Sequence, residues 1–239
     1  DAAEERLRRG DVRGLLPVHL CGHVVDLDRL EDLARRHGVL LLEDCAQSIG
    51  ATWKGRSTGS AGGVAATSFY PTKNLGAMGD GGALLCRDPE HAARARRLRS
   101  YGEGARYDHV EIGLNSRLDE LQAAILGDVM LPRLASWTRC RAAIAEKYCS
   151  SIPSRKIQVP SSAPDSQPVW HLFPVLVEPD RRESFRAHCA AREISTGVHY
   201  PIAIPDQRAV AGLNLEEVNE LPRARRWCAS EVSLPIHPW

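Results

Sequence analysis

The chain has 239 residues, of which 43% are hydrophobic and 26% charged, and its formal net charge is +1. This composition is ordinary for a globular protein of one or two domains, and the small net charge gives no general attraction to nucleic acid. No apolar run approaches the roughly 20 residues of a membrane-spanning helix, and the charged residues 1–11 are unlike a signal peptide. We therefore expect a cytoplasmic protein that binds neither nucleic acid nor membranes.

The seven cysteines and nine histidines are scattered along the chain. The odd number of cysteines, without paired spacing, argues against a disulfide framework, and the histidines show no metal-ligand spacing. We expect buried free thiols and no bound metal.

The first part of the chain is predicted to alternate helices with strands. Residues 1–9 are predicted to end a helix that Gly10 closes, and residues 12–20 to form a strand. An amphipathic helix is expected over residues 28–37. The following run GVLLLE, residues 38–43, is typical of a short parallel strand that is buried on both faces.

Asp44 and Gln47 directly follow this predicted strand. In an open parallel sheet, ligands bind at the carboxyl ends of the strands. There the carboxylate of Asp44 can pair with a protonated ring nitrogen, while Gln47 offers an amide nearby. Residues 50–63 are then predicted to form a loop that turns at residues 54–56.

The stretch SFYPTKNLGAMGDGG, residues 68–82, contains the main candidate for catalysis. Lys73 lies between an apolar segment and a glycine-rich loop, where partial desolvation would lower its pKa and leave an amine able to form an imine with an aldehyde. The hydroxyl of Ser68 can hold a phosphate oxygen. An arbitrary lysine is far more often an exposed residue on a turn, and it is the acid and the amide upstream that favour the catalytic interpretation.

The middle of the chain is predicted to be mostly helical. A strand over residues 83–86 and a helix over residues 89–100 precede YGEGARYDHVEIGLN, residues 101–115, which we expect to be an irregular functional loop. A long helical region over residues 116–151 should bend or break at Pro132.

Serine and proline are concentrated in residues 151–168, which we interpret as the boundary between two domains. We assign residues 1–152 to a partial cofactor-binding large domain and residues 153–239 to a small, truncated C-terminal α/β domain. The small domain should contain a strand over residues 169–177 and a helix over residues 179–192.

Four segments of the sequence, in the right order and at compatible spacings, resemble the DegT and StrS family of sugar aminotransferases, which are fold type I pyridoxal-phosphate enzymes. The segments are PVHLCG, EDCAQSIGATWKGR, SFYPTKNLGAMGDGGAL and GLNSRLDELQAAIL. The resemblance extends from about Leu15 to Pro238, and four ordered motifs are a strong signal where one would be weak. It implies an α/β fold, with an aminotransferase-like large domain built on a partial, mostly parallel sheet flanked by helices, followed by a small α/β domain.

The resemblance implies a role for each residue that would hold pyridoxal 5'-phosphate. The expected contacts are an imine from Lys73, the ring nitrogen with Asp44, the ring hydroxyl near Gln47 and the phosphate with Ser68.

Three further residues match family positions near the ligands. Asn115 would contact the cofactor phosphate of a neighbouring subunit, so that a homodimer shares its active sites, although an asparagine ahead of Arg117 can equally cap a helix. His199 and Tyr200 match a position near the substrate, and a histidine and tyrosine before a proline are more often a packed turn.

The function that the resemblance implies is transfer of an amino group, from an amino acid such as glutamate, to a keto sugar linked to a nucleotide. The amino-acid sequence of the lysine motif is closer to that of family members that aminate the 3-position than to that of members acting on the 4-position. One alternative is a related sugar dehydratase, in which histidine replaces the lysine. Another is a catalytically silent scaffold or remnant of this fold. The family's preceding segment, with a phosphate-binding turn and a stacking aromatic ring, has no counterpart here, so we expect a fragment of a longer protein.

Overall fold

The computed structural model describes residues 2–152, 155–213 and 221–238. The chain divides into two compact units, Asp1–Cys140 with Ser162–His171, and Arg141–Ser161 with Leu172–Trp239. The domain boundary predicted between residues 152 and 153 stays a prediction, because residues 153 and 154 lie outside the described residues. Within the described part of the chain, no helix is both long and apolar enough to cross a membrane.

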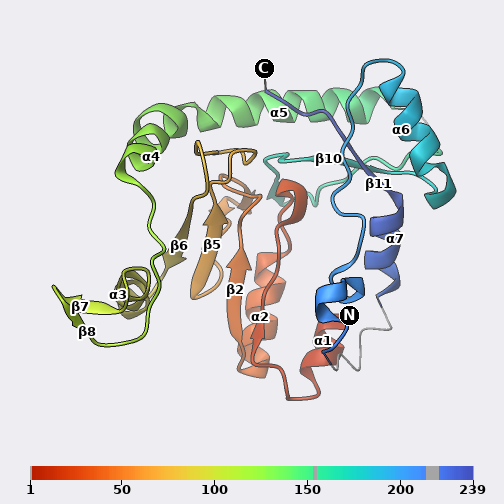
Figure 1. Ribbon diagram of the computed structural model, residues 1–239. Coiled ribbons are helices and arrows are strands. Elements are labelled where there is room, and N and C mark those ends of the chain that lie inside the picture. Colours follow the sequence, from red (N-terminus) through yellow and green to blue (C-terminus); the bar gives the residue numbers. More distant parts are fainter. Residues whose placement is uncertain (1, 153–154, 214–220, 239) are drawn as a thin grey trace. The chain divides into compact units, whose positions relative to one another are not determined.

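The first unit is built on a four-stranded sheet that is mostly parallel (Figure 1). Side by side, the strands are β1 (Gly14–Leu15), β2 (Leu40–Asp44), β5 (Val64–Ser68) and β6 (Gly82–Cys86). β1, β2 and β5 pair in parallel, and β6 returns antiparallel to β5. This confirms the expected fold class.

One face of this sheet carries the core of the first unit. The helix α2 (Leu27–His37), which Asp26 caps through a hydrogen bond from the Arg29 amide, packs its buried side chains against this face. The core residues are Val24, Leu27, Ala34, Leu41, Ala51, Trp53, Ala61 and Val169. The N-terminal helix α1 (Ala2–Leu7) precedes β1.

The expectation that β2 is buried on both faces is wrong for the described chain. Leu41 and Glu43 point into the core, whereas Leu40 and Leu42 are 67% and 37% exposed on the opposite face. Successive residues of a strand alternate between faces, so Asp44 shares the open face with Leu42. The described residues cover only the other face.

A small three-stranded sheet completes the first unit. Its strands are, in order, β4 (Arg56–Ser57), β3 (Thr52–Trp53) and β9 (Ser166–Gln167). Lys54 and Gly55 connect β3 with β4 and have φ angles of 48° and 78°. Two central residues with positive φ form the tight turn that suits the twist of a β-hairpin. The turn predicted at residues 54–56 is therefore confirmed.

The helix α3 (Pro89–Leu98) begins after Asp88, whose side chain accepts a hydrogen bond from the Glu90 amide at 2.8 Å. Beyond it, residues 101–115 are irregular only in part, whereas we expected an irregular loop throughout. The strands β7 (Glu103–Ala105) and β8 (Asp108–His109) form an antiparallel hairpin there.

The long helical region has an irregular turn where a proline break was predicted. It consists of α4 (Glu120–Ala124), a π-helical turn (Ile125–Met130) and α5 (Leu131–Ser151). Pro132 is the second residue of α5, which continues directly from the π-helical turn. The disturbance of the helix therefore lies just before the proline and not at it.

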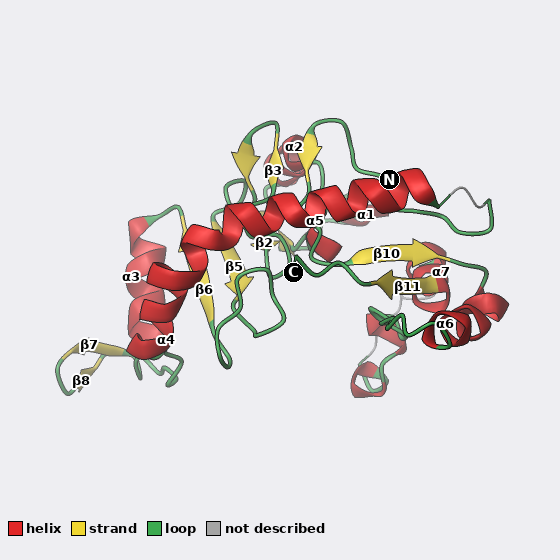
Figure 2. Ribbon diagram, turned by 90° about the horizontal axis from the view of Figure 1, so that it is seen from above, coloured by secondary structure: helices red, strands yellow, loops and turns green. Residues whose placement is uncertain are grey.

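The second unit contains an antiparallel pair, β10 (Phe173–Leu176) and β11 (Glu231–Leu234), beside the helices α6 (Arg182–Ala190) and α7 (Pro222–Ser230) (Figure 2). The predicted strand over residues 169–177 is thus shorter than expected. The helix predicted over residues 179–192 is a 3₁₀ turn (Pro179–Arg181) followed by α6. Further 3₁₀ turns among the described residues lie at Ile204–Asp206 and Arg208–Val210 in this unit, and at Leu20–Gly22 in the first unit.

Candidate active site

Two predicted site residues stand at the ends of neighbouring strands. β2 ends at Asp44 and β5 at Ser68, and the two strands run parallel, so their carboxyl ends meet at the same edge of the sheet. Asp44 pairs with Ala66. Because side chains repeat every second residue along a strand, Ser68 lies on the same open face as Asp44.

The backbone and side chain of Asp44 are both held in place. Its amide donates to the carbonyl of Pro17 at 2.9 Å, and its carbonyl accepts from the amide of His19 at 3.1 Å. One carboxylate oxygen, Oδ1, accepts a hydrogen bond from the Ala46 amide at 2.9 Å. None of the described residues donates a hydrogen bond to the other oxygen, Oδ2, so it is the oxygen that can receive a ligand.

Lys73 lies on the connection between β5 and β6, where its amide donates to the Tyr70 carbonyl at 2.8 Å. Its side chain is half-buried. Burial lowers the pKa of the Lys73 ammonium below its ordinary value, and the negative charge of Asp44 acts in the opposite direction. The predicted partial desolvation of this lysine is confirmed, and the carboxylate of Asp44 is near enough to act on its charge.

Asn74, the neighbour of Lys73, anchors this connection, and sequence reasoning missed it. Its Nδ2 donates to the Val169 carbonyl at 2.9 Å, and its Oδ1 lies 3.2 Å from Nδ1 of His171. The backbone at His171 in turn approaches Gly22 so closely that a Cβ on Gly22 would lie 2.8 Å from the His171 amide nitrogen. The partners of Asn74 are 95 and 97 residues away, so no local pattern could reveal them.

Hydrogen bonds with backbone amides orient the side chains of Gln47 and Ser68. The Gln47 Oε1 accepts from the Cys21 amide at 2.5 Å, and the side chain is buried. The Ser68 Oγ accepts from the Tyr70 amide at 3.2 Å. Both residues therefore have defined orientations before any ligand is present.

Asn115 is exposed and separate from these residues. Its Oδ1 accepts a hydrogen bond from Nε of Arg117 at 3.0 Å. It caps no helix, because Asp119 is the residue that precedes α4, so the capping alternative is wrong. No contact within the described residues joins Asn115 to Asp44 or Lys73.

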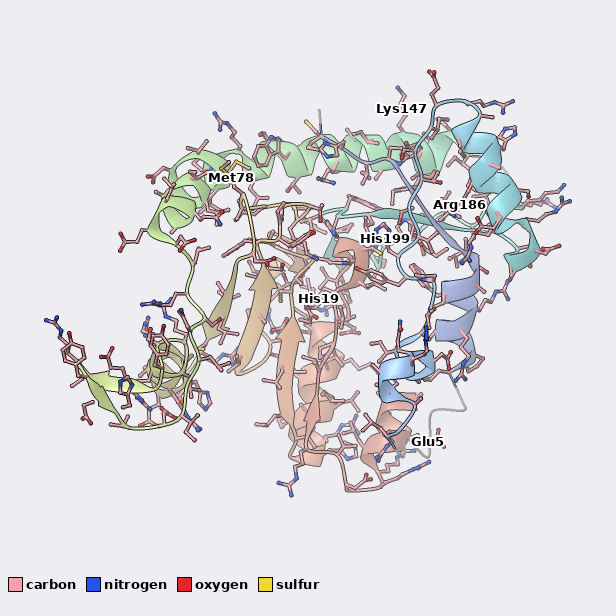
Figure 3. All side chains as sticks on the ribbon, viewed as in Figure 1. Glu5, His19, Met78, Lys147, Arg186 and His199 are labelled. Atoms are coloured by element: carbon pink, nitrogen blue, oxygen red, sulfur yellow. The ribbon has the colours of Figure 1, made fainter. Side chains whose placement is uncertain are left out.

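His199 and Tyr200 belong to the second unit. The imidazole of His199, which is labelled in Figure 3, is half-buried. Its Nδ1 lies 2.9 Å from Oγ of Ser233. The ring of Tyr200 is 50% exposed and meets the imidazole edge-on, with 5.5 Å between ring centroids.

A buried carboxylate lies next to Asp44 in the sequence but on the opposite face of β2. Glu43 accepts hydrogen bonds from Nε2 of His19 (Figure 3) and from three backbone amides. The amide donors are Gly59 at 2.9 Å, Ala61 at 2.7 Å and Gly62 at 3.0 Å. Burial raises the pKa of the Glu43 carboxyl, but the hydrogen bonds outweigh this effect and hold the pKa at about 2.

Cys45 joins His19 and Glu43 in a group whose potential ligand atoms lie within 4.8 Å of one another. Burial and the nearby charge of Glu43 raise the pKa of the Cys45 thiol to about 11, so the thiol is protonated at neutral pH. The oxygens of Glu43 are already occupied by hydrogen-bond donors. We therefore interpret the group as structural, and no metal is assigned to it.

We predict that Glu43→Gln lowers the free energy of unfolding of the chain by roughly 3 kcal/mol at pH 7, as measured by urea titration. The pKa of the folded carboxyl, about 2, lies below the ordinary value of 4.5. The stabilisation is therefore complete above pH 4.5 and is lost as the pH falls toward 2. The exposed Glu5 supplies the control, since Glu5→Gln should change the stability by less than about 0.5 kcal/mol. A loss for Glu43→Gln that persists undiminished at pH 2 would contradict this account.

We also predict that Lys73 reacts as an amine at lower pH than Lys54, and that Asp44→Asn lowers the pKa of Lys73 further. The reason is that the Asp44 carboxylate stabilises the Lys73 ammonium. Trace acetylation at a series of pH values, followed by mass spectrometry, gives the midpoint for each lysine. Lys54 serves as an internal reference whose pKa is shifted in the opposite direction, because its hydrogen bond with Asp28 raises its pKa. A midpoint for Lys73 that rises in Asp44→Asn would refute the coupling.

A mostly parallel sheet, with a half-buried lysine after one strand and a carboxylate at the end of the next, defines an aminotransferase-like protein of fold type I. The chain belongs to the DegT/DnrJ/EryC1/StrS aminotransferase family, whose sequence profile matches residues 2–239. Among solved structures, DesV from Streptomyces venezuelae is similar with a TM-score of 0.89 and 50% identity, over 95% of this chain and 60% of that one. A family member from Brucella abortus has a TM-score of 0.89 and 30% identity, over 100% of this chain and 65% of that one.

Curated relatives carry the names of sugar transaminases. The chain is 49% identical to the dTDP-3-amino-3,4,6-trideoxy-alpha-D-glucose transaminase of Streptomyces venezuelae, over 95% of this chain and 59% of the relative. It is 37% identical to the UDP-2-acetamido-2-deoxy-3-oxo-D-glucuronate aminotransferase of Pseudomonas aeruginosa, over 95% of this chain and 61% of the relative. The chain thus spans about three fifths of the length of these relatives.

The aminotransferases of this family depend on pyridoxal phosphate. NtdA from Bacillus subtilis, with a TM-score of 0.85 and 27% identity over 95% of this chain and 52% of that one, has been solved with the bound cofactor PMP.

Proposed function

We propose that the protein to which this chain belongs is a pyridoxal-phosphate aminotransferase that converts a nucleotide-linked keto sugar into an amino sugar. The proposal rests on one observation about Lys73: burial lowers the pKa of its ammonium, and the negative charge of Asp44 acts on that ammonium. The names of the relatives, which include transaminases of dTDP and UDP sugars, support the substrate class.

Amination at the 3-position is the finer part of this proposal. Two relatives are named for 3-amino sugars, the Streptomyces venezuelae transaminase and the dTDP-3-amino-3,6-dideoxy-alpha-D-galactopyranose transaminase of Aneurinibacillus thermoaerophilus. We further propose an amino acid, glutamate, as the donor, and a cytoplasmic location.

The donor set of the first unit fits the cofactor. A reactive amine, a carboxylate and a hydroxyl come from the edge of one sheet, where β2 and β5 end side by side. Lys73 would bind the aldehyde carbon covalently and Asp44 the ring nitrogen. Ser68 would donate to the phosphate, and Gln47 would lie near the ring hydroxyl.

When bound, pyridoxal phosphate supplies a ring that accepts electrons from the bonds of the substrate carbon. The Lys73 amine would hold the cofactor aldehyde covalently, and as a free amine it would serve as a general base and acid beside the substrate carbon. The carboxylate of Asp44 would hold a proton on the ring nitrogen.

We also propose a homodimer in which Asn115 serves the cofactor of the other subunit. Support comes from large apolar side chains that are strongly exposed along residues 107–121. They are Tyr107 at 79%, Ile112 at 97%, Leu114 at 74% and Leu121 at 73%. Apolar groups that are gathered in this way commonly mark an interaction surface.

The proposal predicts which lysine reacts with the cofactor. The sequence has four lysines, at positions 54, 73, 147 and 156. After incubation with millimolar pyridoxal phosphate and reduction with borohydride, peptide mass spectrometry should find the label mainly on Lys73, because burial lowers the pKa of its ammonium. Lys73→Ala should remove this label, whereas the matched Lys147→Ala should keep it.

Equal labelling of all four lysines would overturn the assignment of Lys73. It would also favour the catalytically silent alternative. The dehydratase alternative is disfavoured already by the lysine itself, since relatives of that kind carry histidine at this position.

A further inference from the structure

A buried carboxylate in the second unit holds His199 through both its backbone and its side chain. Oε2 of Glu231 accepts a hydrogen bond from the His199 amide at 2.6 Å. Oε1 of Glu231 accepts from the Ser233 hydroxyl at 2.5 Å. The same hydroxyl oxygen lies 2.9 Å from Nδ1 of His199. Glu231 and Ser233 are 0% and 4% exposed, so the connection from carboxylate to imidazole is shielded from water.

The neighbouring backbone fixes the position of the imidazole. Glu231 and Ser233 are two residues apart on β11, so their side chains leave the strand on the same face. Gly197 and Ser233 exchange two backbone hydrogen bonds, of 3.0 and 2.9 Å. A Cβ on Gly197 would lie 2.7 Å from Cε1 of His199, so only glycine leaves room for the ring. Nε1 of Trp227 donates to the His199 carbonyl at 3.1 Å.

This arrangement decides which imidazole nitrogen carries the proton. A serine hydroxyl has one proton, and Ser233 gives it to the carboxylate of Glu231. Its oxygen can then only accept toward His199, so Nδ1 must be the protonated nitrogen. Which tautomer a histidine adopts is set by the hydrogen bond at its other nitrogen. Nε2 therefore presents a lone pair, and it makes no hydrogen bond to the described residues.

We infer that Glu231 and Ser233 are positioning residues that hold His199 in its Nδ1–H tautomer, with Nε2 turned to accept a hydrogen bond from a hydroxyl of the sugar substrate. The sugar assignment rests on the proposed function; the tautomer does not. Nε2 of the half-buried imidazole is a hydrogen-bond acceptor, and the exposed ring of Tyr200 beside it is an apolar surface. A sugar ring has hydroxyl groups that can donate to the first and C–H groups that can pack on the second.

The tautomer can be measured directly by NMR on the chain labelled with ¹⁵N-histidine, at pH 8. His199→Gln identifies the signals of His199 among the nine histidines. In the unsubstituted chain, Nδ1 should be the protonated nitrogen, with the Nδ1–H form in at least about tenfold excess, as one good hydrogen bond supplies. A dominant Nε2–H form would overturn the inference without any further variant.

Two variants and a matched control test the roles of the positioning residues. Ser233→Ala removes the acceptor for Nδ1–H and should abolish the excess of the Nδ1–H tautomer of His199. Glu231→Gln should reduce this excess, because an amide can donate to Ser233 and so let the Ser233 hydroxyl donate to Nδ1. Ser230 is the control, since its hydroxyl is buried without a hydrogen-bond partner among the described residues. Ser230→Ala should leave the tautomer unchanged, and Ser233→Thr, which keeps a hydroxyl, should retain it.

The ligand assignment is tested by adding dTDP-glucose, with dTDP as the control. Movement of the Nε2 signal with dTDP-glucose but not with dTDP supports a hydroxyl donor from the sugar. If the signals of other residues move while Nε2 does not, the ligand assignment is overturned and the proposed function survives. If no signal of the chain moves at any concentration of dTDP-glucose, the ligand assignment and the proposed substrate class fall together, while the tautomer result stands on its own.

Discussion

The first unit depends on the burial of one carboxylate, that of Glu43. Its four hydrogen-bond donors are His19 from the segment after β1 and three amides of the loop that leads into β5. These contacts tie β2 to the segments on both sides of it. The next residue, Asp44, faces the other way because side chains alternate along a strand. Two adjacent acids thus have separate tasks: Glu43 stabilises the sheet, and Asp44 remains available at its open face.

The connection that carries Lys73 is held from a distance. Asn74 bonds to residues 169–171, and that segment packs against Gly22. A second anchor is apolar, because Leu75 and Ala77 pack in a cluster with Leu126 and Leu134. Segments from three parts of the chain therefore hold the connection on which Lys73 lies. A local change in residues 169–171 would act on this connection through Asn74.

Much of the fold and part of the site could be predicted from sequence, and the limits are physical. Periodicity and turn residues located α2, α3 and the hairpin turn at Lys54 and Gly55, and motif order led to Asp44 and Lys73. Burial of both faces of β2 was wrongly expected, because an apolar run does not reveal which of its faces the described chain covers. The hairpin within residues 101–115 was not expected, since the pairing of β7 with β8 has little apolar alternation. Asn74 and Glu231 escaped notice because their partners are 32 to 97 residues away.

Each unit contains a histidine held by a buried carboxylate. The difference between the two pairs indicates a structural role for one histidine and a ligand-binding role for the other. In the first unit, Nε2 of His19 faces Glu43, and Nδ1 lies 3.4 Å from the Val25 amide, so a fully buried ring uses both nitrogens internally. In the second, Ser233 stands between Glu231 and His199, and among the described residues only Nδ1 of His199 has a hydrogen-bond partner. A ring with both nitrogens occupied can only stabilise the fold. A ring with one nitrogen fixed, and the other unoccupied by described residues, is oriented for a ligand. The two sites therefore call for different experiments: unfolding measurements for His19 and Glu43, and ligand titration for His199.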